Sequence, residues 1–214
     1  MQDYQDYGWV QSQTPAHLYL LPTLLKVLGP RQDRRILDLG CGSGFLAKKL
    51  LDLGFDVYGA DASTTGISLA SQTHPGRFFV INSSIHALPR ELQGRTFDTV
   101  IATEVIEHLY DPAGFIRFCH AILPLGGELI LSTPYHGYLK NLALALAGAM
   151  DNHFTALWPG GHIKFWSRKT LAALVDAEGF TVTRFMGSGR LPFLWKSMFL
   201  ASTRNSPSTL GDHP

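Results

Sequence analysis

The chain has 214 residues, of which 45% are hydrophobic and 16% are charged, and its formal net charge is +1. This length and composition predict one globular domain with a sizeable core and exclude an intrinsically disordered chain. The near-zero net charge argues against nucleic acid as a partner, because nucleic-acid binders usually carry a basic face.

The first two thirds of the chain alternate between short apolar strands and helical segments. Residues 16–28 have the apolar spacing of a helix, which ends at Gly29-Pro30. The strands expected after it are 35–39, 57–60, 78–81, 99–102 and 128–132, and the expected helical segments are 45–53, 65–73, 88–92 and 112–121. This alternation predicts βαβ units and a doubly wound parallel sheet between layers of helices.

The pattern changes after residue 134. Residues 135–163 are interpreted as a lid-like insertion of loop and helix, followed by a helix at 169–177 and strands at 181–185 and 195–200. The linker at 187–192 is short, so these last two strands are expected to pair antiparallel, and the polar tail from Thr203 is expected to fray. We expect a single domain over residues 1–214, with an N-terminal helical segment at 1–30. Its expected architecture is a three-layer αβα sandwich around a seven-stranded, mostly parallel sheet.

Localisation is inferred from the cysteines and the apolar segments. Cys41 and Cys119 form no disulfide pattern, which favours a reducing cytoplasm, and the start MQDYQDYGWV does not resemble a signal peptide. No window approaches the ~18 apolar residues that span a bilayer. Residues 139–150 are apolar nearly all round, so they are either a buried helix or one that lies at a membrane surface. We expect a cytoplasmic protein, with peripheral membrane contact as an open alternative.

A glycine-rich turn follows the first expected strand. The sequence Asp38-Leu39-Gly40-Cys41-Gly42-Ser43-Gly44 leads from that strand into a helix. The glycines permit a sharp turn and let a ligand approach the backbone closely. The spacing differs from G-x-G-x-x-G, and no phosphate-loop lysine follows. Asp61 comes about twenty residues later, where a carboxylate accepts hydrogen bonds from ribose hydroxyls. The context predicts a nucleotide-type crevice at the carboxyl end of the sheet.

The turn and Asp61 resemble the first two motifs of the class I S-adenosylmethionine (SAM)-dependent methyltransferases, over about residues 33–201. The resemblance implies SAM as co-substrate, with Asp38 facing its amino end and Asp61 binding its ribose hydroxyls. The family usually has Gly-Asp after the third strand, where this chain has Asn82-Ser83-Ser84, so Ser84 or Ser83 would receive the adenine amino group. The implied cofactor-binding residues are Asp38, Gly40, Cys41, Gly42, Gly44, Asp61, Ala62, Ser84 and Thr103.

Two carboxylates and a histidine follow the fourth expected strand. Glu104, Glu107 and His108 have the spacing i, i+3 and i+4, which would place them on one face of a helical turn. Together they suit a divalent cation such as Mg²⁺, Mn²⁺, Fe²⁺, Co²⁺ or Zn²⁺. His162, after Gly160-Gly161, is a candidate fourth ligand. The alternative is that Glu107 and His108 cap a helix or pack against the cofactor without any metal.

This cluster resembles those of two subfamilies, the ubiquinone-biosynthesis O-methyltransferases and the small-RNA 3′-terminal 2′-O-methyltransferases. In both, the resemblance implies a divalent metal that holds vicinal hydroxyls, with Glu104, Glu107, His108 and His162 at the matching positions. A divalent cation lowers the pKa of a hydroxyl and fixes its position. Without a metal, a histidine must act as general base, and the catalytic candidates are His108 and His162, with Glu107 beside them. His153 is a weaker candidate.

The preferred interpretation is SAM-dependent methyl transfer to a hydroxyl oxygen of a small or lipid-like catechol or phenol. An RNA 2′-O-methyltransferase, a metal-independent natural-product methyltransferase and a non-enzymatic SAM-binding regulator stay open as alternatives. Two aromatic groups either shape the site or only pack against the core. They are Tyr4, Tyr7 and Trp9 at the N-terminus, and Tyr135, His136, Tyr138 and Trp158 in the insertion. No motif specifies an oligomeric state.

Overall fold

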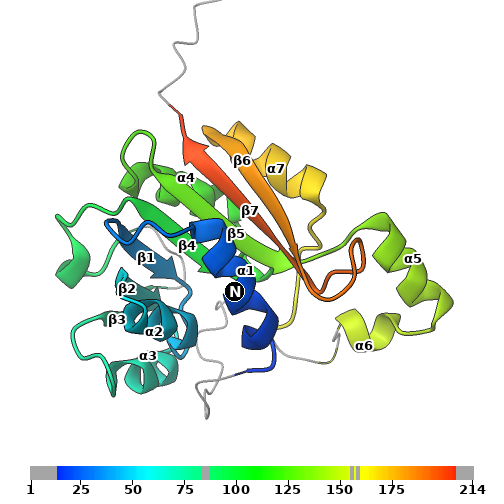
Figure 1. The fold of residues 1–214 in the computed structure, drawn as a ribbon, viewed down its shortest axis with the longest axis horizontal. Helices are drawn as coiled ribbons and strands as arrows, with labels where there is room; N and C mark the ends of the chain where they lie inside the picture. The colour runs from blue at the N-terminus through cyan, green and yellow to red at the C-terminus, as the bar shows by residue number, and fades with distance from the viewer. Residues whose placement is uncertain (1–13, 83–86, 155–156, 158–159, 206–214) are drawn as a thin grey trace, which may run out of the picture.

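The computed structural model describes residues 14–82, 87–154, 157 and 160–205. These residues form a seven-stranded sheet in the order β3-β2-β1-β4-β5-β7-β6 (Figure 1). The strands are β1 Arg35–Leu39, β2 Asp56–Asp61, β3 Phe78–Val80, β4 Thr99–Thr103, β5 Glu128–Pro134, β6 Phe180–Ser188 and β7 Ser197–Arg204. The pairs among β1 to β5 are parallel, whereas β7 is antiparallel to both β5 and β6. The expected fold class and antiparallel pairing are confirmed.

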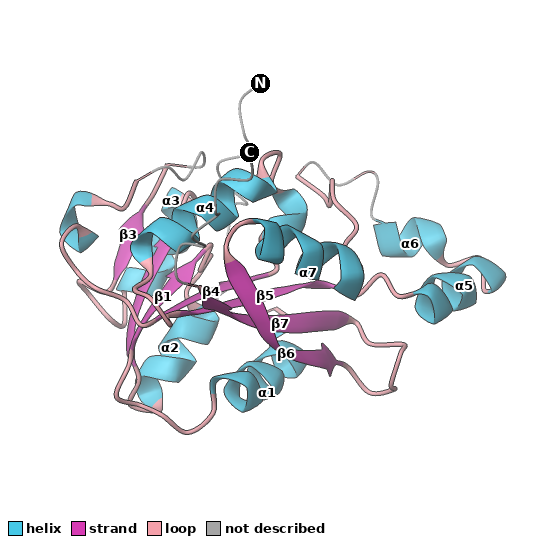
Figure 2. Ribbon diagram, turned by 90° about the horizontal axis from the view of Figure 1, so that it is seen from above, coloured by secondary structure: helices cyan, strands magenta, loops and turns pink. Residues whose placement is uncertain are grey.

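Helices cover both faces of the sheet, and two of them extend beyond its edge (Figure 2). The α-helices are α1 His17–Leu28, α2 Phe45–Asp52, α3 Thr64–Ser71, α4 Pro112–Ile122, α5 Tyr138–Leu146, α6 Met150–Phe154 and α7 Arg168–Ala177. Two short 3₁₀ helices are η1 Arg90–Leu92 and η2 Ile106–His108. Helices α1 and α2 lie on the opposite face from α4 and α7, while α5 and α6 project to one side.

Each face of the sheet has its own hydrophobic core. Successive residues of a strand point to opposite faces, so Ile36 of β1 belongs to the core under α1, α2 and α3, and Leu37 to the core under α4 and α7. Both side chains are fully buried. A strand with helices on both faces is apolar on both faces, and this explains the continuous apolar runs in the sequence.

The strand order reverses beside β1, because β2 follows it on one side and β4 lies on the other. In open α/β sheets, ligands bind outside the carboxyl ends of the strands at such a switch point. The glycine turn follows β1 and the Glu104–His108 segment follows β4, so the topology brings both motifs to this one edge.

The expected end of the last strand is wrong. Residues 195–200 were expected to be that strand, but β7 continues to Arg204, and Thr203 pairs with Glu128 of β5 and Thr181 of β6. The polar end of β7 is ordered because β7 lies between β5 and β6. Its backbone therefore has hydrogen-bond partners on both sides, and these do not depend on the side chains.

The expected helix at 139–150 is also different in the structure. It is two helices, α5 and α6, with Gly148 between them at a φ of 62°. The prediction of a buried apolar helix is wrong, because Lys140 is the buried residue of α5, whereas Tyr138, Leu139, Leu142 and Leu146 are exposed. Among the described residues, no helix is long and apolar enough to cross a membrane.

Candidate active site

The glycine turn is shaped by its backbone. The Gly40 N–H donates to the carbonyl oxygen of Ala60 at 2.7 Å, which ties the turn to the end of β2. Gly40 has a φ of 78°, in the left-handed region, and a Cβ atom there would collide with the side chain of Val105. Glycine is therefore required at position 40 for its conformation and for its lack of a side chain.

Asp61 holds the turn together as well as facing the crevice. Its two carboxylate oxygens accept hydrogen bonds at 2.7 Å from the backbone N–H groups of Gly42 and Ser63. Ser63 in turn caps α3, since its hydroxyl accepts from the Gly66 N–H at 3.0 Å. The sequence pattern assigned Asp61 to ribose alone, whereas the structure adds a role in joining the glycine turn to the start of α3.

Asp38 is a buried carboxyl group that is not fully hydrogen-bonded. Its side chain is 1% exposed, and its Oδ1 atom has no hydrogen-bond partner. Burial raises the pKa of Asp38 to about 8, and the neighbouring Asp61 carboxylate adds to this shift. A buried carboxylate is stable only beside a cation or several donors. The unpartnered Asp38 carboxyl is therefore a candidate site for a cationic group, and the resemblance implied the ammonium group of SAM there.

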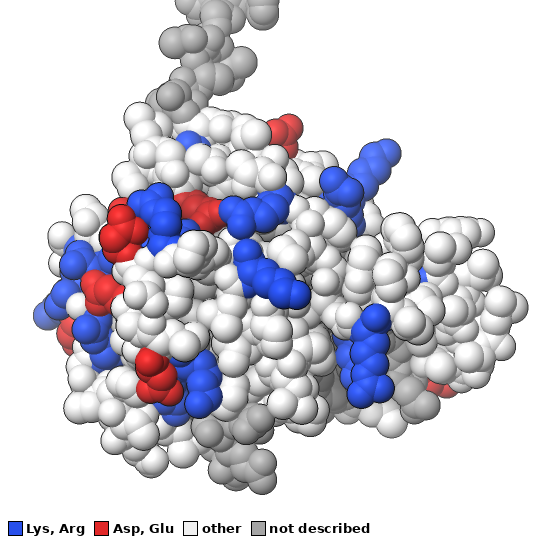
Figure 3. Space-filling model, viewed as in Figure 1, with Lys and Arg blue, Asp and Glu red and all other residues white. Residues whose placement is uncertain are grey.

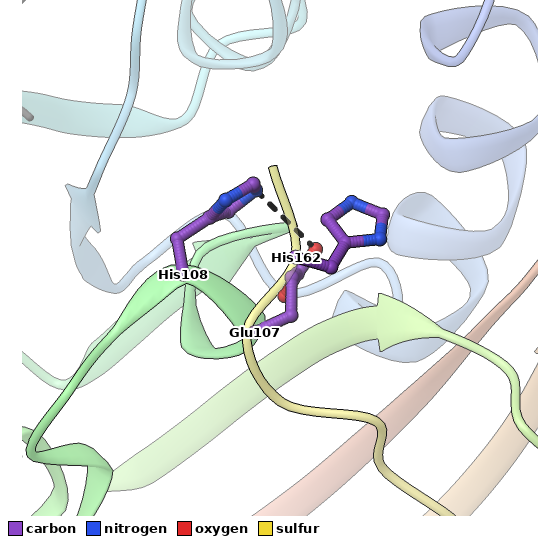
Figure 4. A group of neighbouring side chains, drawn as sticks. All are labelled: Glu107, His108 and His162. Carbon is purple, nitrogen blue, oxygen red and sulfur yellow. Dashed lines mark ion pairs between the residues drawn. The ribbon is translucent and has the colours of Figure 1, made fainter. Parts of the chain in front are cut away.

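Glu107, His108 and His162 form a compact cluster beyond β4 (Figure 4). One ligand atom of each side chain lies within 4.8 Å of the others, and the two imidazole rings lie on either side of the Glu107 carboxylate. The His108 Nε2 atom is 4.0 Å from Glu107 Oε1, and the rings of His108 and His162 are 5.0 Å apart. The structure thus brings together residues more than fifty positions apart.

Backbone hydrogen bonds hold the two halves of this cluster in place. The carbonyl oxygen of Glu107 accepts from the N–H groups of Ile163 and Lys164 at 2.9 and 3.0 Å. The His108 Nδ1 atom lies 2.9 Å from the carbonyl oxygen of Gly160, to which it must donate its proton. That bond leaves the lone pair of the ring on Nε2, the atom that faces Glu107, as in histidines that ligate metals.

The electrostatics of the cluster favour a cation. Both carboxylate oxygens of Glu107 are buried without a hydrogen-bond partner. Burial raises the pKa of Glu107 well above its usual value, with a further contribution from Glu104, while the Glu107 backbone N–H and the Thr133 hydroxyl oppose the shift. Burial lowers the pKa of His162 to about 4, so its ring is a neutral donor of a lone pair at pH 7. One orphaned carboxylate and two neutral imidazoles match the ligand set of a borderline divalent cation.

The expectation that Glu104 shares a helical turn with Glu107 and His108 is wrong. Glu104 precedes η2 and has a φ of 55°, which turns its side chain toward the sheet. Its carboxylate oxygens accept hydrogen bonds from Ser132 at 2.7 Å and Ser197 at 3.0 Å. Glu104 therefore lies beside the cluster, with its oxygens occupied by hydroxyls, and is not one of the three grouped ligands.

Comparison with known proteins identifies the family. A family model for a methyltransferase domain matches residues 11–184. The chain belongs to this methyltransferase family. Its resemblance to the class I SAM-dependent enzymes is thereby confirmed, and the family supports SAM as the co-substrate.

Its curated relatives include ubiquinone biosynthesis O-methyltransferases. That of Methylocella silvestris is 39% identical over 123 residues, which cover 56% of this chain and 47% of the relative. The human mitochondrial enzyme of that name is 32% identical over 173 residues, covering 77% of this chain and 46% of the relative. The chain spans about half the length of these two relatives.

Solved structures show the same fold. A Pyrococcus horikoshii protein has a TM-score of 0.66 at 21% identity, covering 89% of this chain and 90% of that protein. The magnesium protoporphyrin IX methyltransferase of Synechocystis, solved with bound SAH, has a TM-score of 0.62 at 22% identity, covering 86% of this chain and 80% of that one. At these identities the likeness shows the Rossmann-like methyltransferase fold alone.

Three side chains near the cluster were not singled out from the sequence. Lys140 of α5 donates to the carbonyl oxygen of Lys196 at 3.2 Å, and burial lowers its pKa to about 8 while the nearby Glu104 opposes that shift. Tyr19 of α1 has its pKa raised by burial and by Glu104 and Glu107. Ser197 donates to Glu104. No local sequence motif identifies these residues, because each belongs to an element that is distant in sequence from Glu107.

The other residues that the sequence analysis named as candidates lie in several parts of the structure. Ala62 and Thr103 lie at the carboxyl ends of β2 and β4, and Cys41 is a free, partly exposed thiol in the turn. Tyr138 is 80% exposed on α5, so it does not line a buried pocket. Tyr135 packs edge-on against Trp195 at 5.2 Å. Ser84, Trp158, Tyr4, Tyr7 and Trp9 lie outside the described residues.

Proposed function

We propose that this methyltransferase moves a methyl group from SAM to a hydroxyl oxygen of a catechol-like acceptor that a divalent cation positions at Glu107, His108 and His162. The observation that carries the proposal is the cluster itself, whose orphaned Glu107 oxygens are buried between two neutral imidazoles. Such a group is costly to bury without a cation.

The position of the cluster supports an acceptor site. It follows β4, next to the strand that carries the glycine turn, so donor and acceptor would meet at the switch point of the sheet. Asp38 would bind the ammonium group of SAM, and Asp61 with its backbone partners would hold the turn in shape.

The chemistry requires an activated hydroxyl. A divalent cation, when bound, lowers the pKa of a hydroxyl and fixes the oxygen in place for attack on the methyl group. This chain contributes the Glu107 carboxylate, the Nε2 lone pair of His108 and the neutral His162 ring. In the metal-independent alternative, His162 would accept the hydroxyl proton directly.

A lipid-like acceptor is favoured by two observations. Relatives of this chain are named for ubiquinone biosynthesis. In addition, α5, which projects to one side of the sheet (Figure 2), exposes Tyr138, Leu139, Leu142 and Leu146, and Figure 3 shows few charged side chains on the part of the surface that α5 and α6 form. We propose that this apolar face of α5 makes peripheral contact with the membrane from which the acceptor is taken.

The test is transfer of labelled methyl from SAM to a panel of catechols and phenols, with mass spectrometry to locate the methyl on oxygen. Replacement of Glu107 by Gln should lower kcat by roughly 100-fold while the Kd for SAM changes less than about twofold. The matched control is E91Q, which alters an exposed carboxylate on η1. Full turnover by E107Q, or no methylated oxygen on any catechol, would contradict the proposal.

A further inference from the structure

A second group of unpartnered polar atoms lies in the insertion, separate from the Glu107 cluster. His136 is 8% exposed, and neither ring nitrogen makes a hydrogen bond of ordinary geometry, although the Asn141 side chain lies near enough to raise its pKa as a hydrogen-bond partner. The Nε2 atom of His153 is also buried without a hydrogen-bond partner. Buried polar groups in native proteins are almost always paired, so two histidines in one short segment, each with an unpaired ring nitrogen, indicate a missing ligand.

The two histidines face each other inside an aromatic box. His136 follows β5, where its backbone N–H donates to the Trp166 carbonyl at 3.2 Å, and His153 comes from α6. Their ring centroids are 5.2 Å apart. Phe154 stacks on His136 at 6.0 Å, and Phe165 meets it edge-on at 5.1 Å. Apolar rings therefore lie against the histidine pair.

The charge of this group selects the kind of ligand. Burial lowers the pKa of His136 to about 4; His153, Lys140 and His162 add to the shift, and the Asn141 side chain opposes it. Burial and Lys140 also lower the pKa of His153. Both rings are therefore neutral at pH 7, and each has one N–H donor and one lone pair. The Lys140 ammonium disfavours a second metal ion here. A hydroxyl group, which both donates and accepts, matches two neutral imidazoles.

We propose that His136 and His153 form a second acceptor subsite, which binds a hydroxyl substituent other than the one that is methylated. This inference rests on the proposed function, because it assigns the specificity of the same acceptor. His162 relates the subsite to the Glu107 cluster. The centroid of its ring lies 5.0 Å from that of His108, and its charge, when the ring is protonated, lowers the pKa of His136. The acceptor would then carry at least three oxygen substituents, two at the Glu107 cluster and one at the subsite.

The first test measures binding without turnover. The full chain, in complex with SAH, is titrated with catechol, pyrogallol and 1,2,4-benzenetriol while the imidazole ¹⁵N resonances are recorded. We expect at least one triol to shift the ring nitrogens of His136 and His153, and catechol to leave them unchanged. The proposal is overturned if neither triol shifts them, or if Zn²⁺ added to chelator-treated protein shifts both.

The second test measures specificity. H136F and H153F should each raise the KM for the preferred triol about tenfold, while kcat and the KM for catechol stay within about twofold. H74F, at a histidine on the other side of the sheet between α3 and β3, is the control. Equal losses on catechol and triol would show a merely structural role. If the ¹⁵N resonances of the two rings shift but no methyl group is transferred, the proposed function is overturned and the subsite stands. If methyl transfer occurs and the resonances do not shift, the subsite is overturned and the proposed function stands.

Discussion

Asp38 is the residue we propose as the partner of the SAM ammonium group, and its ionisation should link cofactor binding to stability. Its pKa in the SAM-free chain is about 8, against an ordinary value of 3.8. Between these two pH values the folded chain retains a proton that the unfolded chain releases, so stability falls as pH rises from about 4 to about 8. Bound SAM should favour the ionised form and reverse this penalty.

Replacement of Asp38 by Asn should therefore have opposite effects on stability and binding. Without SAM, D38N should melt a few degrees higher than the wild type at pH 8, and its melting temperature should depend less on pH. Its Kd for SAM should rise at least tenfold, because the buried partner of the ammonium group is lost. Calorimetric melting across pH and isothermal titration measure both. An unchanged Kd would exclude Asp38 as the ammonium partner.

Gly40 allows a second test at the residue scale. G40A adds a methyl group in the left-handed region and against Val105, so it should cost about 1–3 kcal/mol of unfolding free energy and abolish SAM binding. Gly29 has a similar φ of 69° but no atom within 4 Å of an added Cβ. G29A should cost about 1 kcal/mol and leave the Kd for SAM unchanged. Equal effects of the two variants on SAM binding would contradict the assigned site.

Individual residues mark the limit of prediction from the sequence. The spacing of Glu104, Glu107 and His108 correctly drew attention to this segment, but the i, i+3, i+4 rule assumes an α-helix. The segment is a three-residue 3₁₀ turn after a residue with positive φ, so Glu104 points toward Ser132 and Ser197. Those serines lie on β5 and β7, and only the folded sheet brings them to it.

At the scale of elements, α5 provides a test of membrane contact. L142E/L146E places two charges on its exposed apolar face, where the side chains are 43% and 81% exposed. The variant should lose cosedimentation with phospholipid vesicles while its melting temperature changes little, because exposed leucines contribute little to the core.

The matched control is L53E/L125E, which changes two exposed leucines at the end of α2 and before β5. It should cosediment like the wild type. Equal vesicle binding by all three proteins would exclude α5 as the contact.

Elements whose burial follows a simple period were predictable, and those held by distant partners were not. The five parallel strands were expected within a few residues of their bounds, since each is an apolar run ending in turn residues. The end of β7 was missed because its polar residues gain their backbone partners from β5 and β6. The burial of Lys140 and the exposure of the leucines on α5 were missed, because Lys140 donates a hydrogen bond to the Lys196 carbonyl oxygen and is attracted by the Glu104 carboxylate.

At the scale of the whole molecule, the strand order makes two separate motifs into one site. The reversal between β2 and β4 places the glycine turn beside the Glu107 segment, and the return of residues 160–164 to the Glu107 carbonyl adds His162. The βαβ alternation predicted this edge of the sheet. The contact between residues 160–164 and Glu107 was not predictable, because no local sequence pattern determines which part of the fold a long connection will contact.

The most direct test of the account is methylation of a catechol by the full chain before and after treatment with EDTA, with SAM binding measured in parallel. We predict that chelation abolishes turnover, that the Kd for SAM stays within about twofold, and that added Mg²⁺, Mn²⁺, Co²⁺ or Zn²⁺ restores activity in the wild type but not in E107Q. Turnover that is indifferent to chelation would contradict the metal-assisted mechanism and leave a histidine of the cluster as the general base.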